Sequence, residues 1–145
     1  MNEIDLAYVA GIIDGEGWIG IRRKKGLRNK LRGYSYAIGV SVGMANDIIP
    51  QWLCLTFGGS VHKHKTRQAN RKESWYWQIE HKTALDFLKI VIPYLKLKIP
   101  QAKLSIEFQE NVKPRQYKYH PKTEEELAIE ETQAVLMHSL NGKGA

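Results

Sequence analysis

Residues 9 to 17 constrain the fold of this chain more than any other segment. They read Val-Ala-Gly-Ile-Ile-Asp-Gly-Glu-Gly and end a helical pattern that we expect to run from about Glu3 to Ile13. Apolar residues occupy every side of this helix, which predicts that it is buried. One side carries small residues and then an acid, namely Ala7, Ala10, Gly11 and Asp14. Because small side chains bury little apolar surface, this face indicates that another backbone packs closely against it.

Two pairs of strands are expected after this helix. Residues 18–25 and 34–44 alternate between apolar side chains and polar or small ones, which is typical of strands with one buried face. We expect them to form a long antiparallel hairpin. Residues 60–67 and 75–80 show the same alternation and predict a second pair.

Helices are expected between and after the strands. Their predicted ranges are about 47–57, 83–92, 100–112 and 123–140, and capping residues or prolines stand near their starts. The predicted order is α-β-β-α-β-β-α-α-α, so the fold class is α+β. A length of 145 residues fits one domain, 1–145, with a core of about residues 4–112 and a C-terminal helical extension of about 123–140.

The sequence shows no feature of a secreted or membrane-spanning protein. No apolar run approaches the roughly 20 residues that cross a bilayer, and no secretory signal is visible. Cys54 is the single cysteine, which suits a reducing compartment. We therefore expect an intracellular protein, in the cytoplasm or nucleoid or in an organelle such as a mitochondrion or chloroplast.

Basic residues are concentrated in the predicted strand region. Residues 17–72 hold twelve Lys and Arg against one acid, whereas residues 121–145 hold five Glu against two Lys. A basic segment on strands favours a phosphate-backbone partner over a merely soluble basic surface.

Residues 9 to 17 resemble the signature of the LAGLIDADG homing endonuclease family. Val9 stands at the first Leu, Ile12 and Ile13 stand at the second Leu and the Ile, Gly15 replaces an Ala, and Glu16 replaces the last Asp. Two further segments match the family, Phe-Gly-Gly at 57–59 and Pro-Tyr-Leu-Lys-Leu-Lys at 93–98. The resemblance covers about Leu6 to Val112. It implies an αββαββα core with an antiparallel DNA-binding sheet, followed here by C-terminal helices.

The resemblance also implies an assembly and an active site. One signature motif implies a homodimer, in which the small face of Ala7, Ala10, Gly11 and Asp14 meets its symmetry mate. It makes Glu16 a catalytic residue and the ligand of Mg²⁺, or of another divalent cation such as Mn²⁺, because hard cations prefer carboxylate oxygens. Lys98 is implied as the active-site lysine, with Lys96 as a second candidate. Asp14 is implied to accept hydrogen bonds from backbone amides rather than to bind metal.

One position departs from the family pattern. The family often carries a metal-site Gln at the end of the second strand, but here that place falls on Gly43 or Met44. Asn46 or Ser41 are the candidate substitutes.

The polar faces of the two hairpins are the predicted DNA-contacting surface. Strand side chains can read base edges in the major groove. The candidate residues are Arg22, Lys24, Arg28, Lys30, Ser35, Ser41, His62, His64, Tyr76 and Gln78.

These observations predict a site-specific endonuclease that cleaves double-stranded DNA as a homodimer on a long pseudo-palindromic site. One alternative is an intron maturase, which binds RNA on the same fold. The other is a DNA-binding protein that has lost catalysis, which the missing Gln keeps open.

Overall fold

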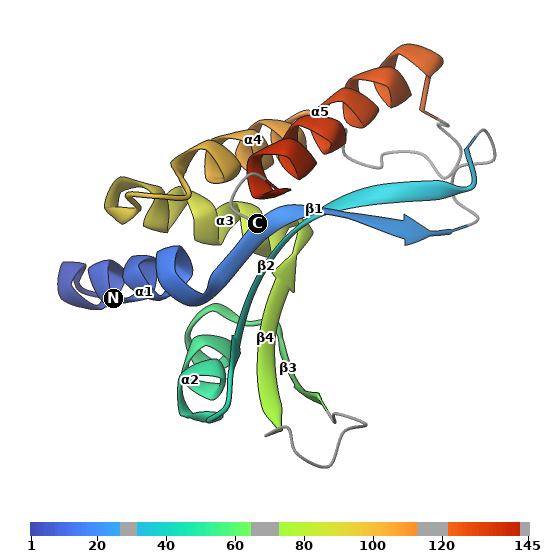
Figure 1. Cartoon of the computed structure of the whole chain (residues 1–145). Coiled ribbons are helices and arrows are strands. Elements are labelled where there is room, and N and C mark those ends of the chain that lie inside the picture. Colours follow the sequence, from blue (N-terminus) through green and yellow to red (C-terminus); the bar gives the residue numbers. More distant parts are fainter. Residues whose placement is uncertain (27–31, 65–72, 113–121, 143–145) are drawn as a thin grey trace.

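The computed structural model describes residues 1–26, 32–64, 73–112 and 122–142, and shows an α+β fold (Figure 1). The elements in chain order are α1 (Glu3–Glu16), β1 (Gly17–Lys25), β2 (Tyr34–Met44), α2 (Ile48–Phe57), β3 (Ser60–His64), β4 (Ser74–Glu80), α3 (His81–Val91), the 3-10 helix η1 (Ile92–Tyr94), α4 (Ile99–Glu110) and α5 (Glu124–Gly142). The predicted αββαββα order and the additional C-terminal helix are confirmed. Arg28 and Lys30 lie outside the described residues.

The four strands form one antiparallel sheet in the order β1-β2-β4-β3. The two hairpins therefore meet through β2 and β4, and their far ends spread apart (Figure 1). The register aligns Gly17, Val42, Trp77 and Val61 in one row across the sheet. Because residues that face each other in antiparallel strands point to the same side, this row fixes which side chains share each face.

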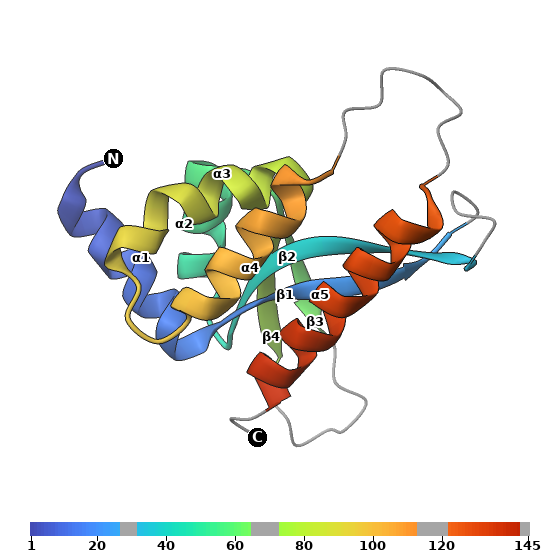
Figure 2. The same ribbon diagram turned by 90° about the horizontal axis from the view of Figure 1, so that it is seen from above.

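The hydrophobic core lies between the helices and one face of the sheet. Ile19, Val40, Val42 and Trp77 point from the strands into it and are fully buried. The helices contribute further buried side chains, which include Val9, Ile13, Leu53, Phe87, Leu88 and Val91. In both views the helices lie on this side, and no described helix covers the other face (Figures 1 and 2).

The helix ends correct three details of the sequence prediction. Helix α1 continues to Glu16, beyond the expected end near Ile13. Helix α3 begins at His81 rather than Thr83, and no side chain caps its start. His81 itself adopts a left-handed backbone with φ of 54°. The β4 strand thus runs straight into α3 through one unusual residue, so the capping residue expected near the start of this helix does not cap it.

Helix α5 extends along the β1–β2 hairpin (Figure 2). It also packs against α4, and near its C-terminal end the Asn141 amide donates to the backbone oxygen of Ile19 at 3.0 Å. The oxygen of that amide accepts a hydrogen bond from Gln101 of α4 at 3.4 Å. None of the helices in the described ranges is long and apolar enough to cross a membrane.

Candidate active site and nucleic-acid interface

Glu16 is the last residue of α1, and its side chain is exposed. It makes no hydrogen bond or ion pair with the described part of the chain. Gly17 follows it and starts β1. A Cβ on Gly17 would lie 2.7 Å from the Cα of Ile13, so only glycine lets the strand leave so close to the helix. This sharp exit leaves the Glu16 carboxylate at the surface, where it can bind a ligand.

The carboxylate of Asp14 has the opposite surroundings. Its two oxygens accept the backbone N–H groups of Lys96 at 2.8 Å and Lys98 at 3.0 Å. These are the backbone hydrogen bonds that the resemblance implied for Asp14. They attach the end of α1 to the segment before α4, so Asp14 supports the site and is not available as a metal ligand in this arrangement.

The ammonium group of Lys98 lies at the same helix end. Its Nζ donates to the backbone oxygens of Ile13 at 2.9 Å and Asp14 at 2.8 Å. A cation at a helix C-terminus is favoured by the unpaired carbonyls there. Lys98 therefore holds the turn that presents Glu16.

The pKa of Asp14 reflects this environment. Burial raises the pKa of the carboxyl, but the amide hydrogen bonds from residues 96–98 and the charge of Lys98 outweigh it and leave the pKa below its ordinary value. Asp14 is therefore an anion at neutral pH.

The described part of one chain does not provide a complete metal site. Within the described residues no group of three or more His, Cys, Asp or Glu side chains could hold an ion. The donor chemistry of Glu16 nevertheless suits a hard cation such as Mg²⁺ or Mn²⁺, which takes carboxylate, phosphate and water oxygens. Glu16 alone does not complete such a site, so further ligands are required beyond those that the described residues bring together.

Helix α1 shows an exposed apolar and small face. Ala7 and Gly11 lie on it, and so do Ile4, 80% exposed, and Tyr8, 52% exposed. This spacing places all four on one side of the helix. Ala10, which was expected on this face, is instead fully buried in the chain's own core. The exposed apolar face of α1 therefore lies on a slightly different side of the helix from the face that the sequence predicted.

The uncovered face of the sheet carries the predicted polar side chains. Lys24 pairs with Ser35, Ser41 pairs with Gln78, and His62 pairs with Tyr76. Arg22 and His64 have the same parity on their strands. The structure therefore brings together all of the described candidates, which are Arg22, Lys24, Ser35, Ser41, His62, His64, Tyr76 and Gln78.

Several of these side chains contact one another across the open face. Arg22 donates to Oε1 of Gln78 at 2.9 Å and lies 4.8 Å from the centre of the Trp18 ring. Glu80 forms ion pairs with Lys24 and, at 4.0 Å, with Arg22. Glu80 and Trp18 were not among the predicted contact residues. Glu80 follows Tyr76 and Gln78 in the alternation of β4, so its position on the open face could be predicted from the sequence. The prediction passed over it because it favoured basic residues.

The structure explains why the end of β2 lacks a glutamine. Gly43 lies on the open face beside Tyr76, and a Cβ there would lie 2.4 Å from the Tyr76 ring. Met44 belongs to the core-facing set. Asn46 accepts the backbone amide of Ile48 at 2.8 Å and so serves the start of α2. Of the two candidate substitutes, only Ser41 lies on the open face.

Comparisons with known proteins agree with this geometry. No protein-family model and no curated protein sequence matches the chain. Among solved structures, the homing endonuclease I-CvuI in complex with the I-CreI target superposes with a TM-score of 0.71, at 19% identity over 96% of this chain and 81% of that chain.

Two further structures show the same likeness. The archaeal intron-encoded homing endonuclease I-Vdi141I complexed with DNA gives a TM-score of 0.59, at 15% identity over 92% of this chain and 98% of that one. The LAGLIDADG meganuclease I-CpaMI bound to uncleaved DNA gives 0.54, at 16% identity over 72% and 35%. The resemblance inferred from residues 9 to 17 is confirmed at the level of the fold: this chain has the fold of the LAGLIDADG homing endonucleases.

Proposed function

We propose that this protein is a site-specific endonuclease that cuts double-stranded DNA as a homodimer with a divalent cation. The observation that carries the proposal is the placement of Glu16. Its exposed carboxylate stands at the end of a helix with an unpartnered apolar face, directly where the open polar sheet begins. Structures with this fold include endonucleases complexed with DNA, which supports a DNA substrate.

The exposed face of α1 supports a homodimer. Ile4 and Tyr8 are large apolar side chains at the surface, while Ala7 and Gly11 between them permit close backbone approach. This surface continues onto α2, because Tyr8 contacts the half-buried Trp52 at 6.0 Å between ring centres. A contiguous apolar surface of this kind is typical of an interface. Two α1 helices that pack here would place both Glu16 residues near the symmetry axis.

The open face of the sheet supports DNA as the partner. Its two hairpins diverge (Figure 1), so a dimer would present four of them along a duplex and read a long pseudo-palindromic site. Lys and Arg supply phosphate and guanine contacts, and Ser, His and Gln supply hydrogen bonds to base edges. Ion pairs such as Lys24 with Glu80 would then be exchanged for contacts to the duplex.

The divalent cation would be held by Glu16, its mate in the partner subunit, and phosphate oxygens of the DNA. When bound, it would supply an activated water and stabilise the charge that develops on the phosphate and leaving oxygen. The chain's own contribution is positional: Asp14 and Lys98 fix the helix end from which Glu16 projects. Lys98 also places a positive charge at the helix end that carries Glu16, where the scissile phosphate would bind, so we assign it a catalytic role.

The test compares Glu16→Gln with the wild-type protein. A library of randomised duplexes is incubated with Mg²⁺ and wild-type protein, and the cut duplexes are sequenced to define a target. We expect Glu16→Gln to fold normally and to bind that target within a few-fold of wild type, since the hairpins supply most of the contacts. It should not cut the target.

Glu107→Gln is the matched control, because it removes the same charge from an exposed position on α4. It should cut like the wild type. Native cleavage by Glu16→Gln would disprove the assigned site. Tight binding to structured RNA by a wild-type protein that cuts no duplex would instead indicate a maturase.

A further inference from the structure

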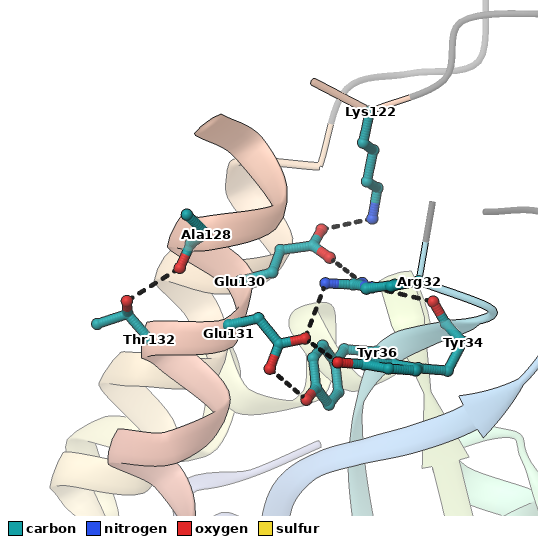
Figure 3. Close-up of polar contacts among 8 residues, drawn as sticks. All are labelled: Arg32, Tyr34, Tyr36, Lys122, Ala128, Glu130, Glu131 and Thr132. Atoms are coloured by element: carbon teal, nitrogen blue, oxygen red, sulfur yellow. Dashed lines mark hydrogen bonds and ion pairs between the residues drawn. The ribbon is translucent and has the colours of Figure 1, made fainter. Parts of the chain in front are cut away.

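A polar cluster joins α5 to the β1–β2 hairpin on the side of the sheet opposite the proposed DNA-contacting face (Figure 3). We call it the hairpin clasp and define it by Arg32, Tyr34, Tyr36, Lys122, Glu130 and Glu131. Its members come from two separate segments: residues 32–36 at the start of β2, and residues 122–131 at the start of α5. No part of it belongs to the site described above.

Glu131 is the centre of the clasp. Its carboxylate accepts hydrogen bonds from the hydroxyls of Tyr34 and Tyr36, the latter at 2.9 Å, and pairs with Arg32 at 3.4 Å (Figure 3). The pKa of Glu131 is lowered, chiefly by the Tyr34 hydrogen bond, and burial together with the Glu131 contact raises the pKa of Tyr36 to about 12. The carboxylate therefore holds two neighbouring rings of one strand in place.

Arg32 completes the attachment. Its guanidinium lies 4.9 Å from the centre of the Tyr34 ring and 4.8 Å from that of Tyr36, and it pairs with Glu130 at 2.7 Å. The side chains of Arg32 and Glu130 are only 10% and 11% exposed. Charge-assisted hydrogen bonds shielded from solvent hold a defined geometry better than surface ion pairs do.

The clasp lies directly behind residues of the open face. Tyr34 and Tyr36 flank Ser35 along β2, and Ser35 pairs with Lys24 of β1. On β1, Arg23 precedes Lys24, and its guanidinium stacks 3.7 Å from the centre of the Tyr34 ring. Because successive side chains of a strand point to opposite faces, restraining Arg23, Tyr34 and Tyr36 from behind also fixes where Lys24 and Ser35 point in front.

This part of the hairpin has little apolar support of its own. The buried apolar core reaches Ile19 and Ile38, whereas the pairs Arg23 with Tyr36 and Lys25 with Tyr34 follow further out on the same face. Polar contacts to α5 take the place of core packing there. A hairpin without them would sample several twists, because a two-stranded ribbon is only marginally stable alone.

We infer that Glu131 is a positioning residue for target recognition, through which α5 sets the direction of the β1–β2 hairpin and so the base preference of Lys24 and Ser35. This inference rests on the proposed function, since it assumes that the open face contacts DNA. It assigns α5 a role in specificity, although the helix lies on the far side of the sheet.

The first arm of the test needs no DNA. Glu131→Ala is compared with Glu125→Ala, which removes an exposed acid one turn and a half earlier on the same helix. Hydrogen exchange is measured at residues 22–25 and 34–37. We expect exchange at least about tenfold faster in Glu131→Ala, because several charge-assisted bonds are lost, and no change in the control. Glu131→Gln, which keeps one acceptor oxygen, should be intermediate.

The second arm measures base preference on the duplex selected by the wild-type protein. In Glu131→Ala, discrimination should fall about tenfold at the base pairs contacted by Lys24 and stay unchanged at those contacted by His64. The double variant Lys24→Ala and Glu131→Ala should lose less binding free energy than the sum of the losses in the two single variants. In the double variant His64→Ala and Glu131→Ala, the two losses should add.

The outcomes separate this inference from the proposed function. A variant that is merely less stable would lose affinity at all base pairs equally, and that result would overturn the positioning role. Unchanged hydrogen exchange in Glu131→Ala would overturn it as well. A third outcome is faster hydrogen exchange in Glu131→Ala together with a wild-type protein that neither binds nor cuts any duplex. That result would refute the proposed function, and the clasp would then hold the hairpin without any role in DNA recognition.

Discussion

Asp14 and Glu16 stand two residues apart in the sequence, yet they have opposite tasks. Asp14 accepts two backbone hydrogen bonds and is tied to the segment before α4, while the Glu16 side chain is exposed and makes no hydrogen bond or ion pair with the described residues. The alternation of glycines explains the difference, because Gly17 forces the chain away from the helix at once. The presence of an acidic residue alone therefore does not identify a metal ligand. The hydrogen-bond donors around each carboxylate decide whether that carboxylate is free to bind a metal.

Asp14→Asn should destabilise the protein by about 1–3 kcal/mol at neutral pH, because an amide cannot replace both acceptor oxygens toward backbone N–H groups. The folded-state pKa of Asp14 lies below its ordinary value of 3.8. Its contribution is therefore fully present above pH 3.8 and is lost as pH falls through the lower, folded-state pKa.

Urea unfolding of wild type and Asp14→Asn at several pH values measures this contribution. The difference in unfolding free energy should be constant near neutrality and shrink at acid pH. A difference that is the same at every pH would show that the charge of Asp14 does not contribute.

At the level of secondary-structure elements, strand alternation was the strongest predictor. It gave the pairing of both hairpins and the shared face of residues such as Lys24, Ser41 and Gln78. It failed to show that α5 supports the β1–β2 hairpin, because Glu130 and Glu131 are 94 or more residues away in sequence from Tyr34 or Tyr36 and no local pattern links them. The start of α3 at His81 was missed because its left-handed backbone replaces a cap.

The open face of β1 depends on a glycine for its shape. A Cβ on Gly20 would lie 2.1 Å from the Trp18 ring, which stacks with Arg22. Gly20→Val should therefore displace Trp18 and weaken binding of the selected duplex by about 0.5–1 kcal/mol, the worth of the lost cation–π contact. The fold should persist, since valine suits a strand.

The measurements are the indole N–H resonance of Trp18 and a binding titration. Gly26→Ala is the control, because the space around a Cβ at that position is empty. An unshifted Trp18 resonance in Gly20→Val would show that the ring accommodates the branch without leaving Arg22.

At the level of the whole molecule, the sequence predicted that helices cover one face of the sheet and that the other face is open. It did not predict which side of α1 stays exposed. Helix α1 is apolar all round, so periodicity alone could not decide which side the core covers. The structure resolves this by burying Val9, Ala10 and Ile13 and exposing Ile4 and Tyr8. The proposed cleavage site needs two carboxylates, and the described end of α1 offers Glu16 alone for this task, so under the proposed function assembly is a condition for cleavage.

Gly11→Leu tests that condition. The space around a Cβ at Gly11 holds no other atom within 4 Å, so the single chain should accept leucine and keep its fold. In the proposed homodimer the same position would face the partner helix, and each inserted side chain should cost about 1–3 kcal/mol of association through overpacking. We therefore expect sedimentation to show a folded monomer that binds DNA weakly and does not cut it. Ala128→Leu, which adds the same side chain to an exposed site on α5, should remain a dimer and cut normally. A Gly11→Leu protein that sediments as the wild-type dimer would place the subunit interface on another surface, and the two Glu16 carboxylates could then no longer share one cleavage centre.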